Sequence, residues 1–362
     1  MPSNPDDGIR ETPTGLGFRM PAEWIPHAAT WIAWPHHRAD WPGKFETIPW
    51  AFAEFARLIA RGEPLRILVN DAAHEGRARR VLSSSAIPTS RLQFLRRPTN
   101  RSWSRDFGPI FLRRNGLRPE IAVARFRFTA WARYPDWRRD DAIPPFAAAR
   151  ARLRLFPIRH RGREVVLEGG SIDVNGRGSI LTTEECLLDP RVQTRNPGFS
   201  RTDYETVFRE ALGATNVLWL GRGIAGDDTH GHVDDICRFV NPRTVVLARE
   251  RNARDVNYRA LAENRERLQG MRLEDGSRLQ VVDLPMPGPV VFDGQRLPAS
   301  YANFYIANAA VIVPTFNDPN DRYALGILAE LFRDRPVVGV HATDLVLGKG
   351  SIHCLTQQEP LP

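Results

Sequence analysis

Clusters of polar and aromatic side chains recur along this chain at similar intervals, and most of them adjoin a strand-like segment. The clusters are centred on Trp34, Asp106, Glu168, His232, Asn303 and Cys354, so the successive spacings are 72, 62, 64, 71 and 51 residues. A chain that repeats one structural unit can bring the same end of each unit to a shared centre. The spacing therefore favours several modules of sheet and helix with converging polar ends. Sequence identity between the units is negligible, and an ordinary α/β protein with polar loops at these intervals is the alternative.

Helical and extended segments alternate between these clusters. Residues 48–62 carry apolar side chains at helical spacing, with Phe52, Phe55, Ala56 and Ile59 on one face. Ser200 and Asp203 have the spacing of a capping box, and we expect their helix to end at Gly213. Turn and strand signals predict further elements: helices over 255–270 and 319–334, a strand over 65–71, and hairpins over 170–188, 237–250 and 304–316. Residues 133–145 are predicted to form the longest surface loop.

The length allows one large domain or two medium ones, and the composition is that of a soluble globular protein. With 362 residues, of which 42% are hydrophobic and 25% charged, the chain can bury a substantial core. No low-complexity linker divides it, so we expect a single domain over 1–362, with 1–14 as a flexible extension. No apolar run approaches the roughly 18–20 residues that span a bilayer, and no secretory signal pattern is visible. The three scattered cysteines suit a reducing cytoplasm, where we place the protein.

The formal net charge of +8 raises nucleic acid as a ligand. Only Lys44 and Lys349 are lysines, however, and the arginines are spread along the chain rather than gathered in a tail. No aromatic–glycine RNA-binding motif or helix-turn-helix pattern accompanies them. We therefore predict neither a nucleic-acid partner nor a membrane partner, and a non-enzymatic binding module is an alternative to an enzyme.

The stretch 226–235, GDDTHGHVDD, packs two histidines and four aspartates into ten positions. Its H-x-H-x-D spacing would suit zinc, with His230, His232 and Asp234 as ligands. Metallo-β-lactamase-like hydrolases have a histidine where this chain has Asp235, and they need more downstream histidines than this chain offers. Alternate side chains on one face of a strand suit a substrate wall equally well. We therefore predict that the protein holds no metal.

Cys354 differs in setting from the other two cysteines. It lies in the glycine-rich polar stretch GKGSIHCLTQQ, whereas Cys186 and Cys237 lie in apolar runs that are typical of buried structural cysteines. A nucleophilic cysteine needs a histidine for proton transfer and carboxylates that orient the substrate. His232 and Asp234 offer both, so the residues allow a thiol-dependent enzyme.

Six ordered motifs of this chain resemble the agmatine deiminase family: MPAEWIPHAATWIAWP, TNRSWSRDFGPI, LEGGSIDV, THGHVDD, LPASYANFYIANAAVIVP and GSIHCLTQQEP. That family belongs to the guanidine-modifying superfamily, also called penteins, in which protein-arginine deiminases are relatives. The resemblance runs from about Gly15 to the C-terminus. It implies an α/β fold, a pseudosymmetric five-bladed propeller of ββαβ modules with the active site at its central axis.

The resemblance also implies a reaction, the hydrolysis of a small cationic guanidine without metal or cofactor. Agmatine would give N-carbamoylputrescine and ammonia. Cys354 would attack the guanidinium carbon to form a covalent thiouronium intermediate, and His232 would protonate the leaving ammonia and then activate water. Asp106 and Asp234 would hold the planar guanidinium by paired hydrogen bonds, and the bound cation would favour the thiolate. We expect His232 and Asp234 on the same side of an extended segment.

Five further residues are expected around the substrate. Trp103 would lie against its methylene stem, and Glu168 would lie near the reacting end. Asp227 and Asp228 would meet the distal amine of agmatine, unless they are turn residues. His230 would tune the pocket.

The chain departs from the family pattern at three positions. Arg101 stands where many agmatine deiminases have an acidic residue, His230 where many have asparagine, and Lys349 within a glycine triplet. Arginine, peptidyl arginine and other alkylguanidines are therefore alternative substrates, and amidino transfer to an amine is an alternative reaction. A homodimer is also left open.

Overall fold

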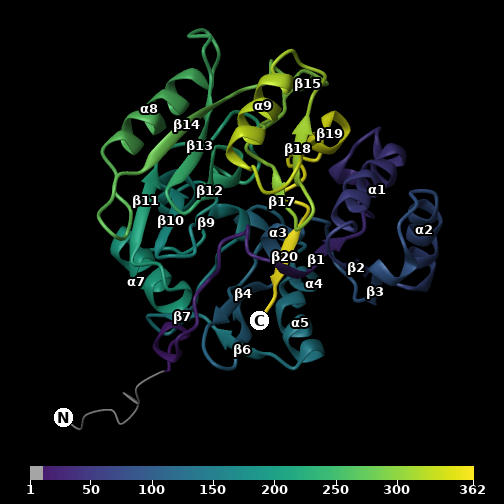
Figure 1. Cartoon of the computed structure of the whole chain (residues 1–362), viewed down its shortest axis with the longest axis horizontal. Coiled ribbons are helices and arrows are strands. Elements are labelled where there is room, and N and C mark those ends of the chain that lie inside the picture. Colours follow the sequence, from purple (N-terminus) through teal and green to yellow (C-terminus); the bar gives the residue numbers. More distant parts are fainter. Residues whose placement is uncertain (1–10) are drawn as a thin grey trace.

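The computed structural model describes residues 11–362, so the expectation for the first ten residues lies outside the described part of the chain. Thr14–Leu16 form a 3-10 turn. The hydroxyl of Thr14 donates to the carbonyl of Arg209 at 2.8 Å and fastens this turn to the helix Arg201–Leu212. In Figure 1 helices α2, α7 and α8 lie toward the periphery of the view, and the C-terminal strand β20 lies near its middle.

Four sheets in residues 11–362 repeat one order of elements: two antiparallel strands, a helix, and a strand parallel to the second. The first comprises β4 (Ile110–Arg114), β5 (Glu120–Arg125), α5 (Ile143–Ala151) and β6 (Arg154–Pro157). The second comprises β9 (Asp173–Val174), β10 (Ser179–Thr183), α7 (Arg201–Leu212) and β11 (Asn216–Leu220). The third comprises β12 (Cys237–Asn241), β13 (Thr244–Arg249), α8 (Tyr258–Gln269) and β14 (Gln280–Pro285). The fourth comprises β17 (Tyr305–Ile306), β18 (Val311–Thr315), α9 (Asp321–Leu331) and β19 (Val337–His341).

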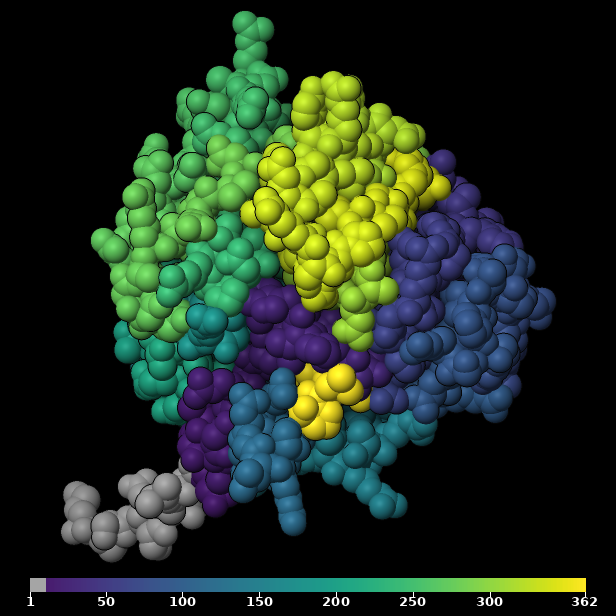
Figure 2. Space-filling view, in the orientation of Figure 1, coloured from purple at the N-terminus to yellow at the C-terminus, as the bar shows by residue number. Residues whose placement is uncertain are grey.

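A further sheet joins the two ends of the chain in the same order. The C-terminal strand β20 (Gln357–Pro360) pairs antiparallel with β1 (His27–Ala33), which is followed by α1 (Ile48–Ile59) and the parallel strand β2 (Leu65–Val69). Helix α2 (Ala72–Ser83) and the parallel strand β3 (Leu92–Arg96) extend this sheet by one strand. Figure 2 shows the last residues bordered by segments from the first half of the chain. The α/β class predicted from the sequence is confirmed.

Local sequence signals account for most of the helices and hairpins. Ser200 and Asp203 make both bonds of the predicted capping box, and Gly213 ends α7 in the left-handed conformation with φ of 73°. The apolar face predicted for 48–62 is buried in α1. Short hairpins β7–β8 (Arg159–His160 and Arg163–Glu164) and β15–β16 (Val291–Phe292 and Gln295–Arg296) lie outside the repeated modules.

The prediction of one long loop over 133–145 is wrong, because this stretch contains α4 (Arg138–Asp141) and the start of α5. The prolines at 144 and 145 occupy the first turn of α5, where a missing N–H costs little. The carboxylate of Asp140 accepts the backbone N–H of Asn100 at 2.6 Å, which ties α4 to a distant loop. None of the helices in residues 11–362 combines the length and the apolar character needed to cross a membrane.

Candidate active site

Five of the six polar clusters stand at equivalent places, just before the first strand of a module. Asp106 lies in the short helix α3 (Ser104–Phe107) ahead of β4, Glu168 ahead of β9, His232 ahead of β12, Asn303 ahead of β17 and Cys354 ahead of β20. Trp34 instead follows β1 and packs on Phe52, with ring centroids 5.9 Å apart. The repeat of polar clusters therefore reflects the order of the modules, except that Trp34 belongs to the hydrophobic core.

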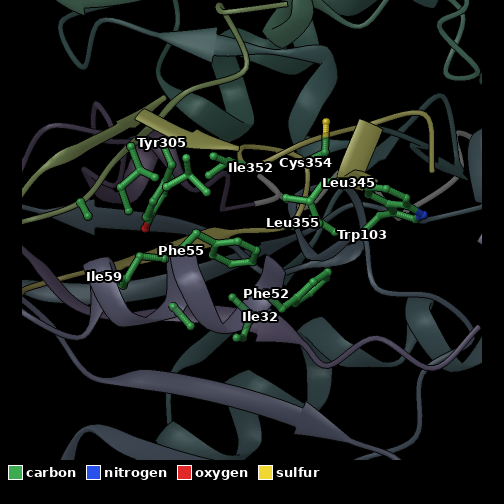
Figure 3. Close-up of a cluster of buried hydrophobic side chains, with 14 of the residues drawn as sticks. Ile32, Phe52, Phe55, Ile59, Trp103, Tyr305, Leu345, Ile352, Cys354 and Leu355 are labelled. Atoms are coloured by element: carbon green, nitrogen blue, oxygen red, sulfur yellow. The ribbon is translucent and has the colours of Figure 1, made fainter. Parts of the chain in front are cut away.

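Cys354 lies at one wall of a cavity of about 390 Å³, which we call the active-site cavity. Its Sγ accepts the Nδ2 hydrogen of Asn303 at 3.1 Å and lies 3.6 Å from Oδ2 of Asp234. Figure 3 shows the sulfur pointing away from Phe52 and Phe55 at the edge of the apolar cluster. Burial, followed by the carboxylates of Asp234, Asp235 and Asp106, raises the pKa of the thiol well above its ordinary value.

His232 is fully buried between two carboxylates. Its Nδ1 lies 3.6 Å from Oδ1 of Asp106, and its Nε2 lies 3.5 Å from Oε2 of Glu168. Within residues 11–362 neither ring nitrogen has a hydrogen-bond partner. Burial alone would lower the pKa of the imidazole, but Asp106, Cys186 and Glu168 raise it well above its ordinary value.

Gly170 separates these catalytic groups. A Cβ at this position would lie 2.6 Å from Nδ1 of His232 and 2.7 Å from Oδ1 of Asp106. Its backbone N–H donates to Oδ1 of Asp106 at 3.0 Å. Glycine is therefore required at position 170, because a larger residue would displace the histidine or the carboxylate.

The two carboxylates expected to bind the guanidinium are buried, and their pKa values shift in opposite directions. Asp106 accepts the indole N–H of Trp131 at 2.8 Å, and burial, with Asp234 and Glu168, raises the pKa of Asp106 to about 6. Oδ2 of Asp234 accepts from His353 at 2.7 Å. Burial alone would raise the pKa of Asp234, but the bond and charge of His353 lower it. Its Oδ1 has no protein partner within residues 11–362.

Glu168 contacts His232 rather than lining the active-site cavity. Its carboxylate pairs with the buried Arg195, whose Nε lies 3.1 Å from Oε1. Although burial opposes ionisation, Arg195 and His232 lower the pKa of Glu168 to about 2. Arg195 also donates to the carbonyl of Thr229 at 2.5 Å, which ties Glu168 to the loop that carries His232.

Trp103, which the resemblance placed against the methylene stem of the substrate, lines the active-site cavity. Cβ atoms built on Gly348 and Gly350 would lie 2.8 Å and 2.9 Å from its ring. The backbone on either side of Lys349, whose φ is 71°, therefore packs directly on the indole. These two glycines explain the glycine-rich sequence before Cys354.

The three other residues expected near the substrate differ in position, and only one of them lines the active-site cavity. Asp228 lines the active-site cavity and accepts the hydroxyl of Tyr134 at 2.5 Å. Asp227 accepts the backbone N–H groups of Gly231 at 2.7 Å and His232 at 3.1 Å, which is the turn role that the sequence left open. His230 is absent from the cavity lining in the described part of the chain, and its Nε2 lies 3.1 Å from Asp189.

Two departures from the family pattern also line the cavity. Arg101 pairs with Asp40 and Asp136, and its guanidinium lies 4.1 Å from the ring centroid of Tyr134. Lys349 bonds Gln295 at 3.3 Å and pairs with no carboxylate within residues 11–362. The charge of Arg101 is therefore balanced by the protein, whereas the charge of Lys349 is available to a ligand.

The proposed H-x-H-x-D zinc triad does not converge, because His230 turns to Asp189. Two other groups of potential metal ligands lie within 4.8 Å of one another in residues 11–362: Glu168, Cys186 and His232, and Asp234, Asp235 and Cys354. The expectation that His232 and Asp234 share an extended segment is wrong, since Val233–Asp235 form a 3-10 turn. The turn still brings both side chains to the site.

Several residues of the site carried no local signal in the sequence. Trp131, Arg195 and Glu23 are distant in the chain from the groups that they contact. Asn303 was marked by its place in the repeat, but its contact with Cys354 was not predicted. Cys186 had been interpreted as structural, yet it lies beside His232 and Glu168.

Comparisons with known proteins agree with this geometry. Residues 19–360 match the family model described as Porphyromonas-type peptidyl-arginine deiminase. An agmatine deiminase of Stutzerimonas stutzeri is 38% identical over 98% of both chains, and one of Ectopseudomonas mendocina is 37% identical over the same shares. The structure of the agmatine deiminase of Enterococcus faecalis matches with a TM-score of 0.89 and 33% identity, covering 98% of each chain. The likeness supports the α/β pentein fold, and the chain belongs to the Porphyromonas-type peptidyl-arginine deiminase family.

Proposed function

We propose that this protein hydrolyses the guanidinium group of agmatine, giving N-carbamoylputrescine and ammonia. The observation that carries the proposal is the meeting of one thiol, one imidazole and two carboxylates beside a single cavity: Cys354, His232, Asp106 and Asp234. Relatives named agmatine deiminase that align over 98% of this chain support agmatine as the substrate.

In the proposed reaction the two carboxylates anchor the guanidinium and its carbon faces Cys354. Sulfur forms a bond to that carbon, and one C–N bond breaks as His232 gives a proton to the leaving ammonia. The product of this step is a covalent thiouronium. His232 then takes a proton from water, and the hydroxide adds to the same carbon. The C–S bond breaks as the hydroxyl proton passes to sulfur, which releases the neutral ureido product and the thiol.

The substrate itself helps to form the nucleophile. Without a ligand, burial and the carboxylates around Cys354 raise the pKa of its thiol, which therefore stays protonated. A guanidinium between Asp106 and Asp234 brings a positive charge that offsets both carboxylates, so the thiolate forms when the substrate is present. His232, held protonated by Asp106 and Glu168, supplies the acid for the first step.

A turnover assay tests the proposal. Purified protein is incubated with agmatine, and both ammonia and N-carbamoylputrescine are measured, with Cys354→Ala as the control. Equal amounts of the two products, formed only by the wild type, are expected. The proposal fails if the wild type is as inert as Cys354→Ala toward every guanidine, and an acceptor amine that takes up the amidino group would indicate amidino transfer instead.

One observation favours arginine, free or within a peptide, as a second candidate substrate. Lys349 lines the active-site cavity without a carboxylate partner in residues 11–362, so it could bind a carboxylate at the far end of the ligand. Agmatine lacks that carboxylate. Comparing kcat/KM for agmatine and arginine distinguishes the two candidates.

We further propose that the five modules form a five-bladed propeller around the site. Their common order of elements, and the equivalent position of one site residue before each first strand, support this arrangement. A homodimer and a cytoplasmic location stay predictions, which sedimentation of the purified protein and fractionation of cells would test.

A further inference from the structure

The residue before the nucleophile, His353, lies between two buried carboxylates. Its Nδ1 is 2.7 Å from Oδ2 of Asp234, and its Nε2 is 2.8 Å from Oε2 of Glu23. All three side chains are at most 4% exposed. A carboxylate only accepts hydrogen bonds, so this geometry uses both ring nitrogens of His353 as donors.

Asp234, His353 and Glu23 form a row of contacts, and Glu23 at its far end is held as an anion. Its two oxygens also accept from Arg238 at 3.0 Å, from Arg105 at 3.1 Å and from the backbone N–H of Ile306 at 2.9 Å. Burial alone would raise the pKa of Glu23, but Arg238, His353 and Arg105 lower it well below its ordinary value. These contacts come from four separate segments, so Glu23 is fixed in position.

The two carboxylate oxygens of Asp234, on the other side of His353, have different surroundings. Oδ2 meets His353 and also lies 3.6 Å from Sγ of Cys354, whereas Oδ1 has no protein partner in residues 11–362. A carboxylate with one oxygen fixed presents the other in one orientation. Oδ1 is therefore left for an N–H of the substrate.

The pKa values of the neighbouring carboxyl groups show why Asp234 needs its contact with His353. Asp106, Asp234 and Asp235 surround one thiol, and burial raises the pKa of Asp106 and of Asp235. Asp234 has the opposite shift because it alone of the three contacts His353. Without that contact, desolvation and the two nearby carboxyl groups would favour a protonated Asp234 that binds a guanidinium weakly.

We propose that His353 and Glu23 are positioning residues of the guanidine site, with His353 fixing Asp234 as an oriented anion and Glu23 keeping both nitrogens of His353 as donors. The inference rests on the proposed function, because it assigns to Asp234 the role of guanidinium anchor. It adds two residues, one of them more than 200 positions away from Asp234 in sequence, to the residues on which guanidine binding depends.

Two substitutions of His353 separate its two contacts. Asparagine places an amide N–H near the position of Nδ1 and keeps the bond to Asp234, whereas glutamine reaches the position of Nε2 and keeps the bond to Glu23. A hydrogen bond to a charged group contributes about 1.5–3 kcal/mol, so His353→Gln is expected to raise KM for agmatine by about tenfold to a hundredfold. His353→Asn should restore most of the loss, and kcat should change less than KM in both.

Another buried pair in the same protein supplies a matched control. Nδ1 of His27 lies 2.9 Å from Oε1 of Glu63, and both side chains are 0% exposed. This pair lies outside the active-site cavity. Because Nε2 of His27 also bonds the carbonyl of Glu23 at 2.7 Å, the control is Glu63→Gln, which leaves His27 in place. This variant should lower the melting temperature without changing KM, which is the result expected of a purely structural contact.

The readouts are KM, kcat and melting temperature for each variant. Equal KM values in His353→Gln, His353→Asn and wild type would overturn the inference, as would an equal rise of KM in the Glu63→Gln control. If both His353 variants fail to fold, Glu23→Gln decides, since it keeps hydrogen-bonding capacity without the charge and should raise KM severalfold. A wild type inert toward every guanidine would overturn the proposed function, whereas an active wild type with unchanged KM in the variants would overturn this inference alone.

Discussion

The active-site cavity contrasts with a larger cavity of the described residues, which lacks the residues of a guanidine hydrolase. The active-site cavity measures about 390 Å³, and a second cavity beside α1 and α2 measures about 570 Å³. The second is lined by aromatic side chains, histidines and arginines, with Glu46 as its one carboxylate within residues 11–362. It lies within a single module, whereas the active-site cavity gathers residues from several. The candidate active site is therefore identified by its position, where the ends of several modules meet, and not by the volume of its cavity.

Buried histidines of the two cavities show the same contrast. His74 in the second cavity has partners for both nitrogens, Asn70 at 3.1 Å and Pro35 at 3.3 Å, and burial, with His36 nearby, lowers its pKa to about 4. His232 has no such partners but has carboxylates on both sides, which raise its pKa. His74 is thus held as a neutral imidazole beside the second cavity, whereas His232 is held in its protonated form beside the active-site cavity.

Removing the two histidines in turn would give the largest difference between the cavities. His232→Ala should lower kcat/KM for agmatine by about a hundredfold to ten-thousandfold, the usual range for a general acid–base group. His74→Gln should leave kcat/KM within about twofold of the wild type, since its cavity takes no part in the reaction. Steady-state kinetics of the two variants checks both values, and a comparable loss from His74→Gln would contradict the assignment.

Two glycine substitutions sharpen the same comparison. Gly170→Ala forces a methyl group against His232 and Asp106, so we expect kcat/KM to fall by about a hundredfold, the cost of displacing catalytic groups by roughly an ångström. Gly76→Ala, in the helix α2 beside the second cavity, has no contact closer than 3.8 Å and should stabilise the fold by about 1 kcal/mol. Kinetics and denaturant unfolding measure the two effects. Unchanged activity in Gly170→Ala would show that the close packing at this glycine is not needed for catalysis.

The two lysines of the chain allow a test of the rim of the active-site cavity. Lys349→Met should lower kcat/KM for arginine by about fivefold, the value of one exposed charge contact, and leave agmatine turnover unchanged. Lys44, which pairs with Asp344 at 3.7 Å and does not line the cavity, provides the control Lys44→Met. Equal kcat/KM for arginine in both variants would remove Lys349 from substrate binding.

The smallest expected effect is on stability in acid. The folded-state pKa of His74 is about 4, below its ordinary value of 6.5, so the unfolded chain binds more protons between these values. The contribution of His74 to stability is therefore present above pH 6.5 and is lost as the pH falls toward 4. Melting temperatures of wild type and His74→Gln should converge by a few degrees across this range. A constant difference between the two proteins would contradict the depressed pKa.

Local signals made the elements predictable, whereas contacts between modules were not. The capping box of Ser200 and Asp203 and the hairpin over 237–250 depend on neighbouring residues, and both were found as expected. The contact of Asn303 with Cys354 and that of His353 with Asp234 depend on the packing of separate modules. No periodicity in the sequence encodes such a pairing.

The motifs marked where the site residues are, but not how they are held. The H-x-H spacing suggested that His230 and His232 act together, yet the φ of 65° at His230 turns it toward Asp189. The row of Glu23, His353 and Asp234 joins three distant segments, and only the tertiary structure brings them into contact.

The pairing of β20 with β1 has a consequence for the order of folding. His27 lies opposite Pro360, so the first and last strands in the described chain must find each other across almost its whole length. Closing so long a loop is entropically costly and slow. Cys354, the proposed nucleophile, lies just before β20, so it reaches the site only when the ends of the described chain meet. Catalytic activity should therefore return with the slowest phase of refolding, after the other modules have formed.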